Sequence, residues 1–162
     1  MDEQHVTPIA SRGEFQQAIR NAIAAAAREG ARELWFADST FADWPLSEPG
    51  VIENLGRWAA SHRKLTLIAE TFDEVARRHA RWSEWRRPWS HIVECRSNDE
   101  LERGQMPCLL LAGNLLAVRL VDPVHHRGTV SRDVPDLVRS REQIDAVLQR
   151  SSEAFPVTML GL

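Results

Sequence analysis

The sequence predicts an α/β domain with a mixed, mostly parallel sheet and helices on both faces. Short apolar runs at residues 34–37, 64–69 and 91–95 alternate with segments of helical periodicity, which favours parallel strands joined by helices. A Gly-Asn dipeptide at 113–114 separates two further apolar runs, a pattern typical of a β-hairpin. Because a tight turn joins antiparallel strands, the sheet is expected to be mixed.

The first helix is the element that the sequence predicts most directly. Ser11 and Glu14 form a capping box, and Gly30 supplies a stop. Apolar residues recur between them at helical spacing: Phe15, Ile19, Ala22, Ile23, Ala26 and Ala27. Residues 1–10 show little periodicity, so the helix is expected to follow an irregular start.

Two strand-helix steps are predicted next. The strand at 34–37 runs into Asp38, where polar side chains would emerge at the carboxyl end of a strand. Residues 41–50 contain two prolines and indicate a loop, and helical spacing returns at 51–61. A second strand at 64–69 ends at Glu70.

The remaining elements are a helix, a strand, a hairpin and a closing helix. Thr71 and Glu74 form a second capping box before a helical segment that Pro88 ends, and a third strand is predicted at 91–95. The hairpin covers 106–122, with its second strand starting at Leu115, and residues 123–136 are expected to be irregular. A third capping box at Ser140-Arg141-Glu142-Gln143 predicts the start of the closing helix. With no repeat or linker, residues 1–162 are expected to form one domain with its core at about 12–152.

Composition indicates a soluble globular protein in a reducing compartment. The hydrophobic fraction of 43% and charged fraction of 27% are ordinary, and a chain of 162 residues suits one domain. No apolar run approaches the roughly 18 residues needed to span a bilayer. The start Met1-Asp2-Glu3 is unlike a signal peptide, so a cytoplasmic location with Cys95 and Cys108 reduced is expected.

The charge pattern gives little support to nucleic-acid binding. The net charge is −3, with 23 acidic and 20 basic residues. All the basic residues are arginine except Lys64, so any catalytic lysine would have to be Lys64. Because the acidic residues outnumber the basic ones, no net attraction to a polyanion is expected.

The order of elements over residues 15–152 resembles half of a phospholipase D-like enzyme. It is more similar still to small uncharacterised bacterial proteins that share this fold but lack its His-x-Lys-x-x-x-x-Asp motif. The runs most typical of the family are His79-x7-Arg87-Pro88-x-Ser90, Ile92-x-Glu94-x-Arg96, and Asp38 with Trp44-Pro45. In active members the motif lies on a hairpin of this kind.

The resemblance implies that the reaction of the family has been lost. In active members the histidine attacks phosphorus and the lysine binds phosphate oxygens, with two motif copies supplied by tandem halves or a homodimer. The corresponding positions here hold Met106, Cys108 and Gly113, which offer neither a histidine nucleophile nor a fixed positive charge. The leading hypothesis is therefore a pseudoenzyme that binds an unknown protein or small ligand, with a homodimer as a further expectation.

A competing hypothesis is a phosphodiesterase or other hydrolase with a rebuilt site. Asp38 and Glu70 would emerge at the carboxyl ends of adjacent parallel strands, where open α/β sheets bind ligands, although helix capping is the favoured role for Asp38. His79 lies on an apolar helical face, where a hydrogen-bonded core histidine is commoner than an acid or base. Arg87 and Arg96 are the candidates for ligand or anion binding.

Two other patterns have ordinary explanations. Residues 77–89 interleave arginine and tryptophan, a composition suited to single-stranded nucleic acid. Helical projection instead predicts a buried Trp82 beside a salt-bridged surface, with Trp85 exposed. His125 and His126 are adjacent and point apart, so no metal site and no cofactor are expected.

Overall fold

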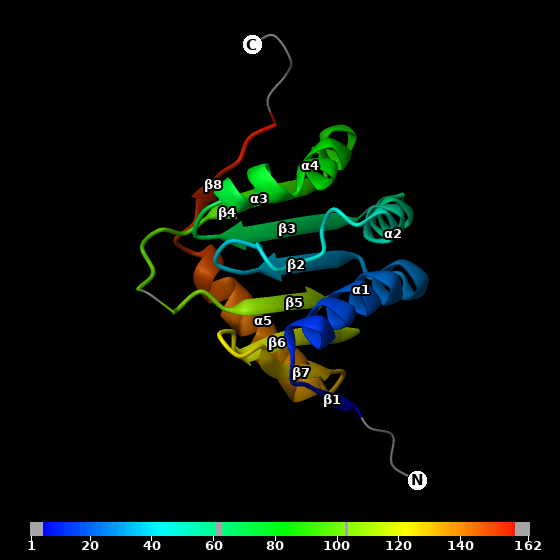
Figure 1. Ribbon diagram of the computed structural model, residues 1–162, viewed down its shortest axis with the longest axis vertical. Coiled ribbons are helices and arrows are strands. Elements are labelled where there is room, and N and C mark those ends of the chain that lie inside the picture. Colours follow the sequence, from blue (N-terminus) through cyan, green and yellow to red (C-terminus); the bar gives the residue numbers. More distant parts are fainter. Residues whose placement is uncertain (1–4, 61–62, 103, 158–162) are drawn as a thin grey trace.

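The described residues form one mixed sheet of eight strands in the order β1-β7-β6-β5-β2-β3-β4-β8 (Figure 1). The computed structural model describes residues 5–60, 63–102 and 104–157. The strands are β1 (Val6–Ile9), β2 (Glu33–Ala37), β3 (Lys64–Ala69), β4 (Val93–Ser97), β5 (Cys108–Ala112), β6 (Leu116–Asp122), β7 (Arg127–Ser131) and β8 (Ser152–Glu153). The helices are α1 (Arg12–Glu29), α2 (Pro49–Ala59), α3 (Asp73–Arg78), α4 (Ala80–Arg86) and α5 (Val134–Leu148), with a 3₁₀ turn, η1, at Arg87–Trp89.

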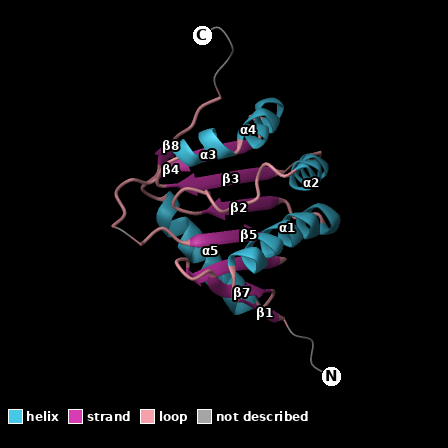
Figure 2. Ribbon diagram, viewed as in Figure 1, coloured by secondary structure: helices cyan, strands magenta, loops and turns pink. Residues whose placement is uncertain are grey.

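Helices cover both faces of the sheet, as expected. In Figure 2, α1, α2, α3 and α4 lie in front of the strands and α5 lies behind them. Each face has its own hydrophobic core, because successive strand residues point to opposite sides. In β5, for example, Leu110 belongs to the core under α1, whereas Leu109 and Leu111 belong to the core under α5.

The expectation of a mostly parallel sheet is wrong. Only the β2–β3 and β3–β4 pairs are parallel, and the other five pairings of the described sheet are antiparallel. The sequence pattern identified the strands that are buried on both faces. It missed β1 and β8, whose residues are largely exposed, and β7, which is mostly half-buried, because none of them gives a continuous apolar run. Each of these three strands adds antiparallel pairing.

The prediction for α1 is confirmed in detail. The Ser11 hydroxyl accepts a hydrogen bond from the Glu14 amide at 3.1 Å, and the Glu14 carboxylate accepts one from the Ala10 amide at 3.0 Å. Gly30 ends the helix in the left-handed conformation with φ +81°. Both halves of the capping box therefore form, and glycine meets the backbone requirement at the other end.

The predicted helix before Pro88 is broken in two. Its backbone departs from helical geometry at His79, with φ −119° and ψ 49°, so α3 ends and α4 begins there. The predicted capping box at Thr71 does not form, since Phe72 occupies the cap position with no side-chain bond. The Thr71 hydroxyl instead accepts from the Asp73 amide, two residues along.

The predicted hairpin is present, with a longer loop and a further strand after it. Ala112 pairs with Leu116, so three residues rather than two connect β5 to β6, and Gly113 takes φ +46°. The segment expected to be irregular contains β7. The closing helix begins at Val134, which places Ser140 inside α5 and not at its cap.

No helix within the described ranges is long and apolar enough to cross a membrane. The acidic residues 1–3, on which the cytoplasmic expectation partly rests, lie outside the described ranges. Cys95 and Cys108 are both free thiols. They lie on β4 and β5, which β2 and β3 separate in the sheet.

Candidate functional site

The candidate site lies where β2 ends and β5 begins. Ala37 pairs with Leu109 in the antiparallel ladder, so the next residue of β2, Asp38, continues toward Cys108 at the start of β5. The Cys108 thiol and the Asp38 carboxyl are close enough for each to change the pKa of the other. This is the position that the resemblance assigns to the phosphate-binding lysine.

Asp38 holds a turn together and does not cap a helix, which corrects the expected role. Its Oδ2 accepts hydrogen bonds from the amides of Thr40 at 3.2 Å and Phe41 at 2.7 Å. Phe41 lies in the left-handed region at φ +62°, an unfavourable conformation for a bulky residue that these bonds help to fix. Desolvation raises the pKa of Asp38 above its usual value, although the two amide bonds act in the opposite direction.

Aromatic side chains of the loop after Asp38 fill the space over the end of the strand. Phe41, Trp44 and Leu46 are all 2% exposed or less. The Trp44 ring lies 4.9 Å from the Phe41 ring and 5.3 Å from the Phe36 ring, centroid to centroid. The loop therefore closes the carboxyl end of β2 with packed apolar groups.

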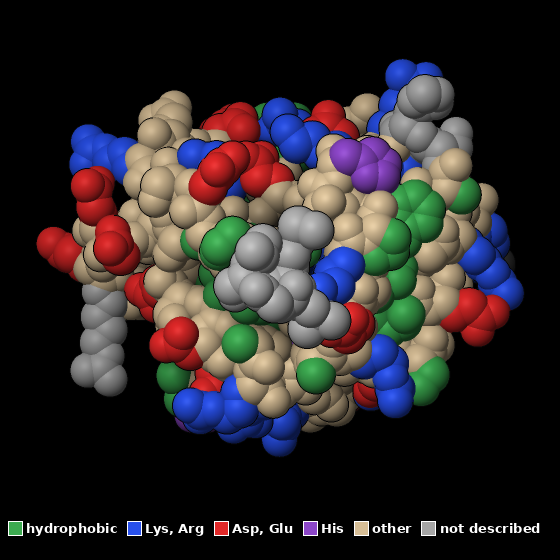
Figure 3. Space-filling view, turned by 90° about the horizontal axis from the view of Figure 1, so that it is seen from above, with side chains coloured by type: hydrophobic (Ala, Val, Ile, Leu, Met, Phe, Trp, Pro, Cys, Tyr) green, Lys and Arg blue, Asp and Glu red, His purple; other side chains and the backbone are tan. Residues whose placement is uncertain are grey.

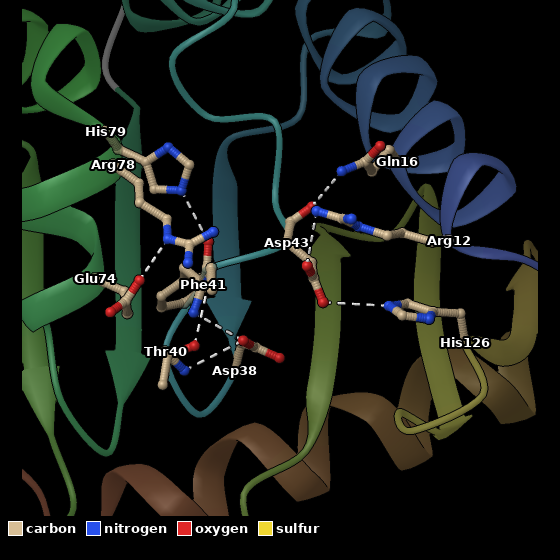
Figure 4. A network of polar contacts seen from close by, with 11 residues as sticks. Arg12, Gln16, Asp38, Thr40, Phe41, Asp43, Glu74, Arg78, His79 and His126 are labelled. Carbon is tan, nitrogen blue, oxygen red and sulfur yellow. Dashed lines mark hydrogen bonds and ion pairs between the residues drawn. The ribbon is translucent and has the colours of Figure 1, made fainter.

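Asp43 gathers three side chains at the rim of this loop (Figure 4). Its carboxylate accepts from Arg12 at 3.1 Å and lies 3.2 Å from His126 Nε2, and its backbone carbonyl accepts from Gln16 at 2.9 Å. No sequence pattern indicates this cluster, because its members come from α1, the loop and the β6–β7 turn.

His79 lies apart from the Asp43 cluster and is buried, with 6% of its surface exposed. Its Nε2 lies 2.8 Å from the Phe41 carbonyl, which fixes Nε2 as the donor (Figure 4). Burial lowers the pKa of His79, and the hydrogen bond to the carbonyl opposes that shift. Nδ1 is buried without a partner among the described residues. This arrangement suits a neutral core histidine.

Met106 and Cys108 are both buried and belong to different cores. Met106 packs under α5, whereas Cys108 packs on the opposite face of the sheet. Burial raises the pKa of the Cys108 thiol well above its usual value, and the charges of Asp38 and Asp43 raise it further. The thiol is therefore neutral at physiological pH in a locally negative environment.

The other predicted residues do not join this site. Glu70 follows β3 and is half-buried, and its described hydrogen bonds are made by its backbone. Arg96 donates to the Ser151 hydroxyl and carbonyl at 2.6 and 2.8 Å and to Glu94 at 2.8 Å. Arg87 lies 3.4 Å from Glu84 at the surface. Anion binding by Arg87 and Arg96 stays a prediction.

The arginine and tryptophan segment does not form one stacking surface. Arg77 and Arg78 pair with Glu74, Trp82 is fully buried as expected, and Trp85 is half-buried where exposure was expected. Figure 3 looks onto the end of the molecule that carries β8, and there acidic and basic side chains are interspersed.

His125 and His126 bind different carboxylates, at Asp122 and Asp43. Across residues 5–60, 63–102 and 104–157, no three His, Cys, Asp or Glu side chains gather as metal ligands would.

Comparison with solved structures identifies the fold, whereas comparison of sequences finds no match. No protein-family model matches the chain, and no curated protein matches it. Its structure is similar to that of Nuc from Salmonella typhimurium, a phospholipase D family member, with a TM-score of 0.58, 8% identity and coverage of 93% of this chain and 98% of that one. The fold is phospholipase D-like.

A second similar structure is that of TrmBL2, an archaeal chromatin protein whose structure shows a novel mode of DNA binding. The TM-score is 0.65 at 13% identity, over 93% of this chain. The chain spans about half of TrmBL2, 54% of its length. At these identities the two matches show a shared fold, and function has to be argued from the residues.

Proposed function

We propose that this chain is a non-catalytic phospholipase D-like domain with a binding or scaffolding role. The observation that carries the proposal is the burial of Cys108 beside Asp38 at the motif's lysine position. A phosphodiester is an anion, and its hydrolysis needs fixed positive charge at the transferring phosphorus. Here a buried neutral thiol takes the place of a lysine, so this position offers no positive charge.

The surroundings of the motif's histidine position support the same proposal. Met106 is 5% exposed and packs in the core under α5, away from Cys108. The loop residues Phe41 and Trp44 occupy the space above the strand end. A substrate would have to displace packed aromatic side chains before it could reach either position.

The competing hypothesis, a hydrolase with a rebuilt site, is less well supported. Its proposed base, His79, uses Nε2 for the Phe41 carbonyl and makes no hydrogen bond to Asp38 or Glu70 among the described contacts. Nucleic-acid binding is the weaker binding alternative, since the arginines of 77–89 are largely paired or buried. Affinity for single-stranded DNA that falls steeply with salt would support that alternative.

The test is hydrolysis of bis(p-nitrophenyl) phosphate by the purified protein, by Cys108→Ala and by His79→Ala. We expect no turnover above the buffer rate from any of the three. Hydrolysis that is lost in either variant would overturn the proposal, whereas hydrolysis that both variants retain would identify a contaminant. Sedimentation velocity of the same samples at micromolar concentration tests the homodimer, which stays a prediction.

A further inference from the structure

A cavity of about 690 Å³ lies between the outer edge of β4 and the chain that follows β8. Its lining includes Lys64, Arg86, His91, Glu94, Cys95 and Phe155. The volume is in the range of small-molecule sites, which are commonly about 300–1,000 Å³. This cavity shares no lining residue with the Asp38 and Cys108 site.

The cavity is open because the terminal chain stops pairing with β4. Continuing the register of Arg96 with Glu153 brings Ala154 to Cys95, whose carbonyl accepts from the Ala154 amide at 3.0 Å. Phe155 then takes φ +47°, and Pro156 has no N–H to donate. Among residues 5–60, 63–102 and 104–157, the outer edge of β4 at Val93 is therefore left without a neighbouring strand.

Arg86 lies in the wall of this cavity and is 5% exposed. Its guanidinium carbon lies 4.4 Å from the Phe155 ring centroid and 5.8 Å from that of Trp82. Nη1 donates to the Phe155 carbonyl at 2.6 Å and to the Cys95 sulfur at 3.2 Å. These contacts fix the plane of the guanidinium.

The other edge of the same guanidinium is unused. Nε is buried and has no hydrogen-bond partner, and Nη2 donates to none of the described residues. The Nε and Nη2 hydrogens point in parallel, which is the geometry that binds the two oxygens of a carboxylate. A buried guanidinium that keeps this edge free lacks the partner that burial normally requires.

No described carboxylate neutralises Arg86. The ion pairs of the described residues do not include it, and among those residues the side chain to which it donates a hydrogen bond is the Cys95 thiol. Burial raises the pKa of Cys95 to about 11, so the thiol is neutral at physiological pH. A buried cation without a counter-ion is costly, and an anionic ligand would remove that cost.

The charges around the cavity favour a ligand with a single negative charge. Glu94 and Glu153 both line it, and only Glu94 is compensated, by Arg96 at 2.8 Å and Lys64 at 3.8 Å. A doubly charged phosphate would be repelled by these carboxylates more strongly than a monoanion.

We propose that this cavity binds a small monocarboxylate, with its carboxylate at Nη2 of Arg86, the donor of that edge that its neighbours do not seal from the cavity. Its apolar part lies against Ile92, Val93 and Phe155, which line the same space. The inference rests on the proposed binding role and gives it a location and a ligand class. It would assign ligand binding to a surface remote from the residues of the family's motif.

The test follows the Arg86 Nε–H resonance of the full chain by ¹H–¹⁵N NMR during titration with benzoate. We expect the chemical shift of this resonance to saturate with a Kd of about 1 mM or tighter. The amide resonances of Val93 and Ala154 should shift with the same Kd. Benzamide, which has the same ring and no charge, should produce no saturating shift. Inorganic phosphate should bind more weakly than benzoate.

Two variants support the assignment. Arg86→Lys keeps the charge, removes the fork and should weaken benzoate about tenfold, equivalent to about 1.4 kcal/mol. Arg81→Lys, on an exposed arginine of α4 that does not line the cavity, should leave the Kd within about twofold. Arg86→Lys could alter the position of the chain after β8, so a second variant is needed. Lys64→Gln changes another residue of the cavity lining without altering a contact of Arg86, and it should also raise the Kd for benzoate.

The following results of the titration would contradict the proposed site. No saturating shift of the wild-type Arg86 resonance, or an equal shift with benzamide, would remove the carboxylate site. Phosphate binding at least as tight as benzoate would reassign the site to phosphate groups. Since the phosphodiester assay does not depend on this cavity, failure here and failure of the non-catalytic proposal are separately visible.

Discussion

Asp38 and Cys108 lie side by side where β2 ends and β5 begins, and the Asp38 carboxylate raises the pKa of the Cys108 thiol, whereas the thiol lowers the pKa of Asp38. Both groups are removed from water, and desolvation is the largest cause of the raised pKa of each. Burial therefore favours the protonated form of each of the two groups. The pair therefore makes the strand end a poor place to bind a phosphate and a sensitive place to test by pH.

Asp38→Asn should become more stable relative to wild type as pH rises from about 4 to 7.5. The folded pKa of Asp38 is raised, so the stability it contributes is present below the unfolded value of 3.8 and is lost as pH rises through the folded pKa. Asparagine keeps an oxygen that can accept from the Thr40 and Phe41 amides. Urea denaturation of both proteins across this range measures the difference.

Asp136→Asn is the matched control with the opposite sign. The Ser131 hydroxyl and then Arg139 lower the pKa of Asp136, so its contribution is present above pH 3.8 and is lost as pH falls. This variant should lose stability relative to wild type as pH rises. Parallel curves for Asp38→Asn and wild type would show that the Asp38 carboxyl titrates normally in the folded chain.

How far the sequence predicted the sheet depended on burial. The central strands β2, β3 and β5 were identified because both of their faces are buried, which makes them continuous apolar runs. The edge and near-edge strands carry exposed residues and, in β1, a proline, so local pattern could not separate them from loops. Three of the five antiparallel pairings involve strands that the sequence did not reveal, and the β2–β5 pairing joins two revealed strands whose adjacency no local pattern shows.

The candidate site was less predictable because it depends on long-range pairing. Asp38 was identified from its place after a strand, but its neighbour Cys108 becomes visible only once β5 is known to lie beside β2. Likewise, Arg12 and His126 meet at Asp43 from distant parts of the chain. No spacing rule connects residues of this kind before the topology is known.

Ser11→Ala should destabilise the fold by about 1 kcal/mol, the usual cost of a lost N-cap. Its hydroxyl accepts from the Glu14 amide at the start of α1. Thr71→Ala is the control, because the same sequence pattern there does not produce a capping box. We expect a smaller loss for Thr71→Ala in urea denaturation, and equal losses would contradict the difference between the two helix starts.

Gly128→Ala should be strongly destabilising, by roughly 2–4 kcal/mol, as expected for steric overlap inside a sheet. A Cβ at this position would lie 1.9 Å from the Arg119 carbonyl oxygen and 2.7 Å from the Leu120 Cα. Gly128 pairs with Leu120 on one side and Ile9 on the other, so neither strand can move away freely.

Gly13→Ala is the steric control for Gly128. It lies in the first turn of α1, where a Cβ would have no heavy atom within 4 Å, so alanine should be neutral or stabilising by about 0.5–1 kcal/mol. Thermal melts of both variants compare them directly. A mild effect of Gly128→Ala would mean that β6 and β7 are not packed as closely as this register requires.

Cys95 should make the folded state lose stability between pH 9 and 11. Its folded pKa is raised from 9.0 to about 11, chiefly by burial, so the folded state holds a proton that the unfolded chain has released. The contribution is complete below pH 9 and is lost as pH rises through the folded pKa, an effect of about 2–3 kcal/mol. Cys95→Ala lowers stability at every pH by removing packing, so the informative quantity is the slope. We expect a shallower fall for Cys95→Ala than for wild type in urea denaturation over this range, and equal slopes would place the thiol in contact with water.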